Sequence, residues 1–185
     1  MPSPADKTLP FARGDVADAG ELSWDTTVFE HLVGRTYWVD DSVHGTGSQV
    51  CLRVCRAEAA ITVARKFVDW GTDAGDFGRY VADLTPTAGA PTKPLDDKYT
   101  VGATIGANTL FYVVESGPCY CTTEGSSVSL SAGDPVATDN AGCVNGAVAA
   151  AGESVVGQID AASTTTGENV LVWVAPGLRG AEAAG

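Results

Sequence analysis

The second half of the sequence is almost free of basic side chains. No Lys or Arg occurs between Tyr99 and Leu178, whereas residues 1–98 carry ten of the eleven basic residues. Nucleic-acid backbones and anionic lipid surfaces are both bound largely through Lys and Arg. With a net charge of −12 as well, the chain is expected to bind neither a nucleic acid nor a membrane.

Long apolar runs are missing too. The chain has no stretch of about 18 consecutive apolar residues, so no membrane-spanning helix is expected. Its first residues, MPSPADKTLPFARGD, contain no apolar centre of a secretory signal peptide. Synthesis and assembly in a cytoplasm are therefore expected.

Catalytic and nucleotide-binding motifs are also missing, since the sequence contains no GxSxG, GxxxxGK[ST] or GxGxxG pattern. His31 lies in the apolar context FEHLV and His44 in the turn DDSVHGTG. Asp40, Asp41 and His44 form the tightest mixed cluster of titratable groups. Turn capping by aspartate explains that cluster without a catalytic base. The chain is therefore not expected to be an enzyme, and no catalytic residue is assigned.

The cysteines are odd in number, and no secretion signal accompanies them. They are Cys51, Cys55, Cys119, Cys121 and Cys143. The CxxxC and CxC spacings without a nearby His make a poor zinc pattern, so small buried thiols are favoured over a metal site. Oxidation of a cross-strand pair stays open.

An acidic segment, GDVADAGELSWD, is the other candidate for a metal. It contains Asp15, Asp18, Glu21 and Asp25, at a spacing that does not match an EF-hand loop. A solvated acidic loop is the favoured interpretation. No metal and no cofactor is assigned to the chain.

What the sequence does contain is a β pattern. SQVCLRVCRA alternates apolar and other residues with a period of two, and TLFYVVES is rich in aromatic and β-branched residues. From there on, strand-like runs recur at about ten-residue intervals between Gly or Asn-Gly turns, as in small sandwiches and barrels. The prediction is a mainly β protein with a small, tulip-like β-sandwich or β-barrel at its C-terminal end.

Prolines suggest the domain boundaries. Residues 1–23, with Pro2, Pro4 and Pro10, are predicted to be an extended arm. Residues 24–84 are a β-rich region, and the Pro-rich run 85–98 is a linker or surface loop. Residues 99–177 form the second β-domain. Residues 178–185 are a flexible tail.

The order of elements in the second half resembles a known family. After LSAGDPVATDNAGCVNGA come ESVVGQIDAAS and NVLVWV, an order similar to the C-terminal β-domains of head decoration, or cement, proteins of tailed bacteriophages. The residues that carry the resemblance are Gly133, Asp134, Val136, Gly142, Val156, Gly157, Ala161, Val170, Val172 and Val174. The resemblance covers about residues 99–176, and residues 24–84 have no counterpart in it.

The resemblance implies a structural role in a virion. Such proteins usually bind the outer surface of a phage capsid as homotrimers and clamp neighbouring subunits of the major capsid protein. An extended N-terminal segment often lies on the capsid. The expected interface residues in the arm are Pro4, Leu9, Pro10 and Phe11, and those elsewhere are Trp24 and Trp173.

Alternatives of other classes stay open at this point. Trp24, Phe29, Trp38 and Trp70 are candidates for either core or interface positions, because aromatic residues are enriched in both. If the three tryptophans line a cleft, the chain is a carbohydrate- or receptor-binding β-module of a phage tail or fibre. An ordered arm and stoichiometric binding to heads would favour the capsid role instead.

Overall fold

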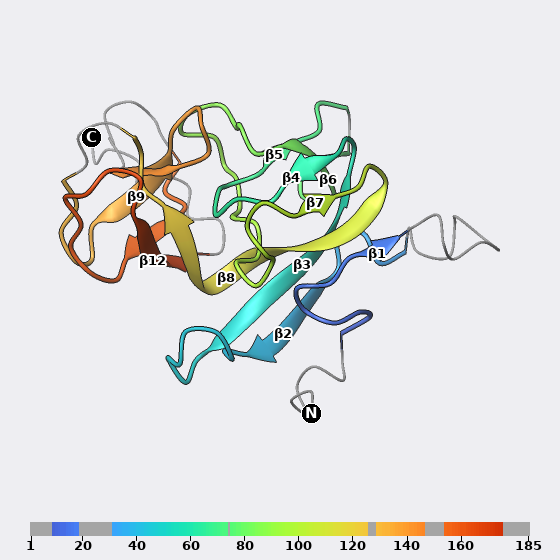
Figure 1. The fold of residues 1–185 in the computed structure, drawn as a ribbon, viewed down its shortest axis with the longest axis horizontal. Coiled ribbons are helices and arrows are strands. Elements are labelled where there is room, and N and C mark those ends of the chain that lie inside the picture. Colours follow the sequence, from blue (N-terminus) through green and yellow to red (C-terminus); the bar gives the residue numbers. More distant parts are fainter. Residues whose placement is uncertain (1–8, 19–30, 74, 126–128, 147–153, 176–185) are drawn as a thin grey trace, which may run out of the picture.

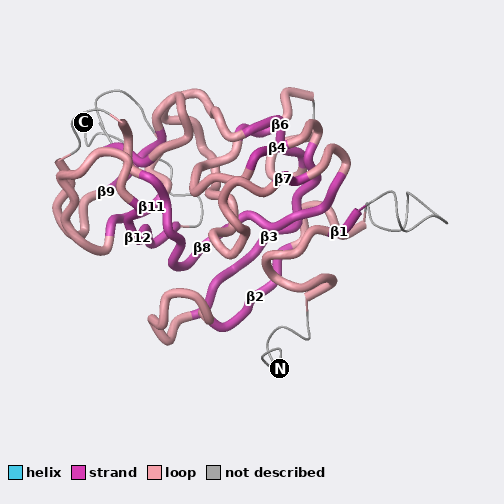
Figure 2. Tube along the Cα trace, in the orientation of Figure 1, coloured by secondary structure: helices cyan, strands magenta, loops and turns pink. Residues whose placement is uncertain are grey.

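The computed structural model describes residues 9–18, 31–73, 75–125, 129–146 and 154–175. These ranges contain strands, turns and loops and no helix (Figure 2), so the mainly β prediction is confirmed. Among them there is accordingly no helix long and apolar enough to cross a membrane. Pro4, Trp24 and the expected tail 178–185 lie outside the described residues.

Ten of the strands form one sheet, and β4 and β7 form a small second sheet. The strands are β1 (Ala17–Asp18), β2 (Thr36–Asp40), β3 (Gln49–Ala57), β4 (Ile61–Thr62), β5 (Asp69–Trp70), β6 (Tyr80–Asp83), β7 (Thr104–Ile105), β8 (Thr109–Thr122), β9 (Pro135–Thr138), β10 (Val144–Gly146), β11 (Gly157–Ile159) and β12 (Asn169–Val174). The order along the large sheet is β10-β9-β11-β12-β8-β3-β6-β5, with β1 on β8 and β2 on β3.

Strand β8 lies between β12 and β3 in the large sheet and crosses the middle of Figure 1. Its first half pairs with β3 up to Ser116, and from Gly117 onward it pairs with β12. Gly117 has a φ of +105°, and a Cβ there would lie 2.7 Å from the carbonyl oxygen of Gln49. Only glycine fits this close approach without strain. It therefore stands where β8 changes its pairing partner.

One hydrophobic core runs along this sheet. Its fully buried members include Leu52 from β3, Phe111 and Tyr112 from β8, and Ile159 from β11. In β12 the three valines face the core, while Trp173 points to the other side, as the period of two predicts.

Residues 85–98, expected as a linker or surface loop, are buried in their second half. Pro94 forms a bridge with Phe67, Leu95 forms one with Val113, and Leu95 belongs to the core. Asp96 and Asp97 are buried too. The sheet and the core continue on both sides of this segment, and independent folding of regions 24–84 and 99–177 stays a prediction.

Candidate functional site

The N-terminal segment 9–18 lies on the domain's own sheet. The ring of Phe11 stacks on Tyr112 with centroids 4.3 Å apart, and the Tyr112 hydroxyl donates to the Phe11 carbonyl at 2.9 Å. Leu9 also packs against the core, while Pro10 is exposed. Strand β1 then pairs with the start of β8. A contact of Leu9, Pro10 or Phe11 with another chain stays a prediction.

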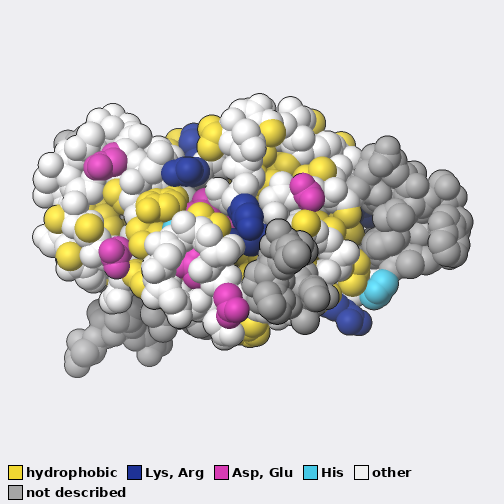
Figure 3. Space-filling model, turned by 60° about the horizontal axis from the view of Figure 1, so that its bottom comes forward, with side chains coloured by type: hydrophobic (Ala, Val, Ile, Leu, Met, Phe, Trp, Pro, Cys, Tyr) yellow, Lys and Arg dark blue, Asp and Glu magenta, His cyan; other side chains and the backbone are white. Residues whose placement is uncertain are grey.

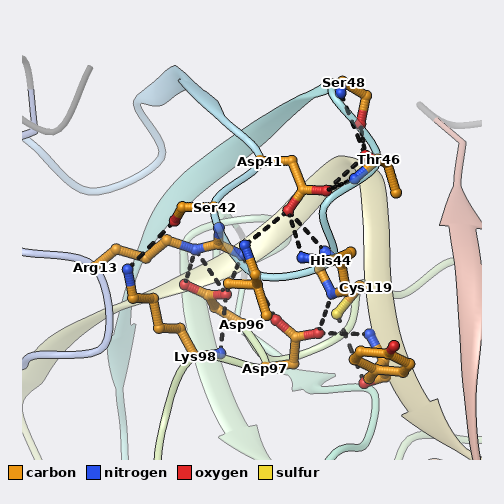
Figure 4. Close-up of polar contacts among 12 residues, drawn as sticks. Arg13, Asp41, Ser42, His44, Thr46, Ser48, Asp96, Asp97, Lys98 and Cys119 are labelled. Carbon is orange, nitrogen blue, oxygen red and sulfur yellow. Dashed lines mark hydrogen bonds and ion pairs between the residues drawn. The ribbon is translucent and has the colours of Figure 1, made fainter. Parts of the chain in front are cut away.

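A buried ion pair fixes the same segment more firmly. The Arg13 guanidinium donates to Asp96 from two nitrogens, Nη2 to Oδ1 at 2.7 Å and Nε to Oδ2 at 2.9 Å (Figure 4). The two side chains are 1% and 0% exposed. Burial disfavours the cation, but the Asp96 carboxylate outweighs it and raises the pKa of Arg13. Such a pair is costly to break, because one charge would then stay buried alone.

His44 joins two further segments next to this pair. Its Nδ1 lies 2.9 Å from Asp41 Oδ1, and its Nε2 lies 2.6 Å from Asp97 Oδ2. Burial alone would lower the pKa of His44, but the carboxylates of Asp97 and Asp41 raise it above its ordinary value. With an acceptor at each ring nitrogen, the protonated imidazolium is the favoured form.

Asp41 organises the loop between β2 and β3. Its carboxylate accepts from the backbone N–H groups of Val43, His44 and Thr46 and from the Thr46 hydroxyl. Burial opposes ionisation, but these donors lower the pKa of Asp41 well below its usual range. The turn-capping interpretation of Asp41 therefore agrees with the geometry.

These five side chains, Arg13, Asp41, His44, Asp96 and Asp97, form an anchor network. It connects the N-terminal segment, the β2–β3 loop, the segment before β7 and, through the backbone N–H of Tyr120, strand β8. All five side chains are enclosed, with exposures of 1% or less. A substrate therefore has no access to His44, and the network acts by holding segments together. The sequence gives no signal for Arg13, Asp96 or Asp97, because their partners lie 53 to 83 positions away.

One surface feature is the unpaired edge of strand β2. Among the described residues β2 pairs only with β3, and Figure 1 shows it at the margin of the sheet. The backbone N–H of Asp41 donates to the carbonyl of Ser48 on the β3 side. Because hydrogen-bonded and open positions alternate along a strand, the backbone N–H and C=O groups of Asp40, Trp38 and Thr36 point to the unpaired side. Trp38, at the centre of the strand, is 59% exposed.

The other tryptophans differ from Trp38. Trp70 is buried in the core. Trp173 is 37% exposed on β12, and its indole N–H donates to Asp160 at 2.9 Å. Its side chain is thus available to a partner, although a subunit interface there stays a prediction. Phe29, like Trp24, lies outside the described residues.

The five cysteines are free and buried, as the interpretation of small buried thiols expects. Burial raises the pKa of Cys51 and of Cys143. Within the described ranges no three His, Cys, Asp or Glu side chains lie close enough to hold a metal ion. Asp15 is exposed, and Glu21 and Asp25 lie outside these ranges.

On one face of the molecule the acidic groups lie singly. On the face in Figure 3, Asp and Glu side chains are scattered among hydrophobic and uncharged atoms and do not form one patch. This face therefore offers a partner no single acidic patch.

Comparisons with known proteins give little further information. No family model and no curated protein matches the chain. Among solved structures it is similar to the head fiber gp8.5 N base of bacteriophage phi29, at 12% identity and a TM-score of 0.39, over 69% of this chain and 96% of that one. A likeness at this level does not identify a family or a function.

Proposed function

We propose that the chain is a phage virion structural protein that binds the outer surface of a capsid and reinforces the lattice of the major capsid protein. The observation that carries the proposal is the unpaired edge of β2 with Trp38 at its centre. An open edge is a template for a strand of another chain, which pairs through backbone hydrogen bonds. An exposed Trp beside such a ladder is a frequent anchor of protein interfaces.

The anchor network supports the same role. It ties the N-terminal segment and the loop that follows β2 to the sheet, so little ordering of β2 is needed on binding. Segment 9–18 also fixes the position of Leu9, to which residues 1–8, with Pro4, are attached. We propose that these residues lie along the capsid surface as an extended arm.

A homotrimer on the lattice would multiply such contacts. Several modest contacts made together give a high total avidity. Trp173, exposed on β12, is our candidate for the contact between trimer mates. Its location on a different strand from Trp38 leaves the two surfaces separable by mutation.

The proposal is tested by binding to purified capsids that were assembled without this protein. We expect the wild-type chain to saturate them at a fixed stoichiometry and to raise the temperature at which they release DNA. Trp38→Ala removes the anchor. Trp38→Pro also removes a backbone donor on the open side, which an edge strand tolerates. Both variants are expected to bind at least about tenfold more weakly.

Phe77→Ala is the matched control, because Phe77 is another exposed aromatic residue, on a different segment of the chain. It is expected to bind like the wild type. If the wild-type protein fails to bind capsids, the proposed capsid role is wrong. If all variants bind capsids equally well, the β2 edge is not the capsid-binding surface.

A further inference from the structure

A cavity of about 150 Å³ lies beside β3 and β5, away from the anchor network. Its walls and floor include Trp70, Phe77 and Pro91 together with Arg53, Lys93 and Glu115. A cavity of about this volume accommodates a single six-membered ring. The occupant is therefore one ring or one side chain of a larger molecule.

One wall of the cavity is aromatic and firmly held. The Trp70 indole N–H donates to the carbonyl of Pro91 at 3.1 Å, which fixes the ring in the core. Phe77 lies against it, with centroids 5.6 Å apart and planes inclined at 56°. Phe77 is nevertheless 63% exposed, so much of its ring is available to a ligand. The wall suits a ligand with at least one apolar face.

The charged side chains of the cavity are two cations and one carboxylate, and the protein itself already binds each of them. Arg53 Nε donates to Glu115 Oε2 at 2.8 Å, and Arg53 Nη1 donates to the Gly78 carbonyl at 3.2 Å. Lys93 Nζ donates to the carbonyls of Glu115 and Ala175 and lies 3.7 Å from Glu115 Oε1. Burial lowers the pKa of Lys93, and Glu115 opposes this shift. The ammonium is thus engaged by the protein itself.

Arg53 and Glu115 remain partly exposed side by side, so the floor offers a donor next to an acceptor. An anion only accepts and would face the Glu115 carboxylate. A cation only donates and would face Arg53 and Lys93. A purely apolar side chain would displace water from Arg53 and Glu115 without replacing the lost hydrogen bonds, which is costly. A hydroxyl both donates and accepts, and it suits this pair.

We propose that this cavity binds one ring of a neutral carbohydrate. The apolar face of the sugar packs on Phe77 and Trp70, and its hydroxyls hydrogen-bond to Arg53 and Glu115. No residue of β2 lines the cavity, but Arg53 is the register partner of Thr36 on β2, so the site lies next to the β2 edge. The inference does not depend on the capsid role.

The test uses an immobilised panel of neutral glycans beside sialylated and phosphorylated ones. The methyl glycosides of the monosaccharides in each bound glycan are then added as free competitors at up to about 10 mM, a range suited to weak binding of a single ring. We expect neutral glycans to bind and a free monosaccharide to compete. Competition shows that one ring fills the site, whether it comes from a free sugar or from a polymer.

Three variants locate the site. Phe77→Ala is expected to weaken binding about tenfold, and Phe77→Trp, which keeps a stacking ring, is expected to retain it. Trp38→Ala is the matched control, since Trp38 is exposed but does not line the cavity. Thermal unfolding confirms that each variant is folded.

Other outcomes overturn the inference. Absence of any neutral-glycan binding, preference for acidic glycans, or binding unaffected by Phe77→Ala would each contradict it. Loss through Trp38→Ala alone would move sugar binding to the β2 edge. Since Phe77→Ala is expected to leave capsid binding intact, failure here is distinguishable from failure of the capsid role.

Discussion

Replacing Arg13 by Met leaves the Asp96 carboxylate buried without its cationic partner. Both side chains are essentially inaccessible to solvent. Without Arg13, the Asp96 carboxylate keeps one long hydrogen bond, from the backbone N–H of Lys98 at 3.3 Å. Breaking one half of a buried pair typically costs about 3–5 kcal/mol. We expect Arg13→Met to lower the free energy of unfolding by about this amount at pH 7, as measured by urea denaturation.

The double variant Arg13→Met/Asp96→Leu separates the charge from the packing. Hydrophobic replacement of a whole buried pair is often close to neutral, so the double variant is expected to recover most of the loss. Burial already raises the pKa of Asp96, with Arg13 opposing the shift. In Arg13→Met the carboxyl will therefore take up a proton more readily, and the deficit will shrink as the pH falls. A single variant within about 1 kcal/mol of wild type would refute the anchoring role of the pair.

Three further predictions concern stability and reactivity. Because the pKa of His44 is raised in the folded protein, its contribution to the free energy of unfolding is complete below about pH 6.5. This contribution is lost as the pH rises through the pKa of His44 in the folded state. The urea midpoint of unfolding, followed by fluorescence, should therefore decrease as the pH is raised from about 6 to about 9, and it should decrease more steeply than in His44→Gln. The same dependence of the midpoint on pH in both proteins would contradict this. Gly117→Ala, at a φ of +105° and facing Gln49, should lose about 1–3 kcal/mol in chemical denaturation, and an unchanged midpoint would show that β8 adapts. The five buried thiols should resist iodoacetamide in the folded protein and react fully in urea, which mass spectrometry counts, and fast labelling of the native chain would contradict their burial.

Local patterns predicted much of the fold. The valines of β12 alternate with Trp173 along one strand, and the structure buries the valine face as the period of two requires. Asp41 caps a turn within five residues of its own position, so turn chemistry was enough to interpret it. Each of these features depends on neighbours in the chain, which a sequence displays directly.

Features that depend on residues far apart in the chain could not be predicted from local sequence patterns. In PLDDK the two aspartates read as part of a polar linker, yet they are buried against Arg13 and His44. Nothing in the local composition distinguishes a solvated aspartate from one paired across the fold. Trp38 and Trp70 were likewise equivalent as residues, and only the topology places one on an open edge and the other in the core.

The glycines and valines behind the family resemblance have structural explanations. A Cβ at Gly157 would meet the backbone carbonyl of Trp173, and one at Gly142 would meet that of Leu84. Val136 and Val172 are fully buried. The packing of β9, β11 and β12 therefore explains Gly157, Val136 and Val172, and a close approach to Leu84 explains Gly142. Of the proposed partner contacts, Trp38 and Phe77 lie outside the resemblance and Trp173 lies within it.

The most direct test of the capsid role is electron cryomicroscopy of capsids saturated with the full-length chain. We predict density for the protein on the outer surface, with a strand of the major capsid protein paired along β2 and Trp38 buried against it. Density in which β2 and Trp38 face solvent, or capsids that carry no additional density, would contradict the account.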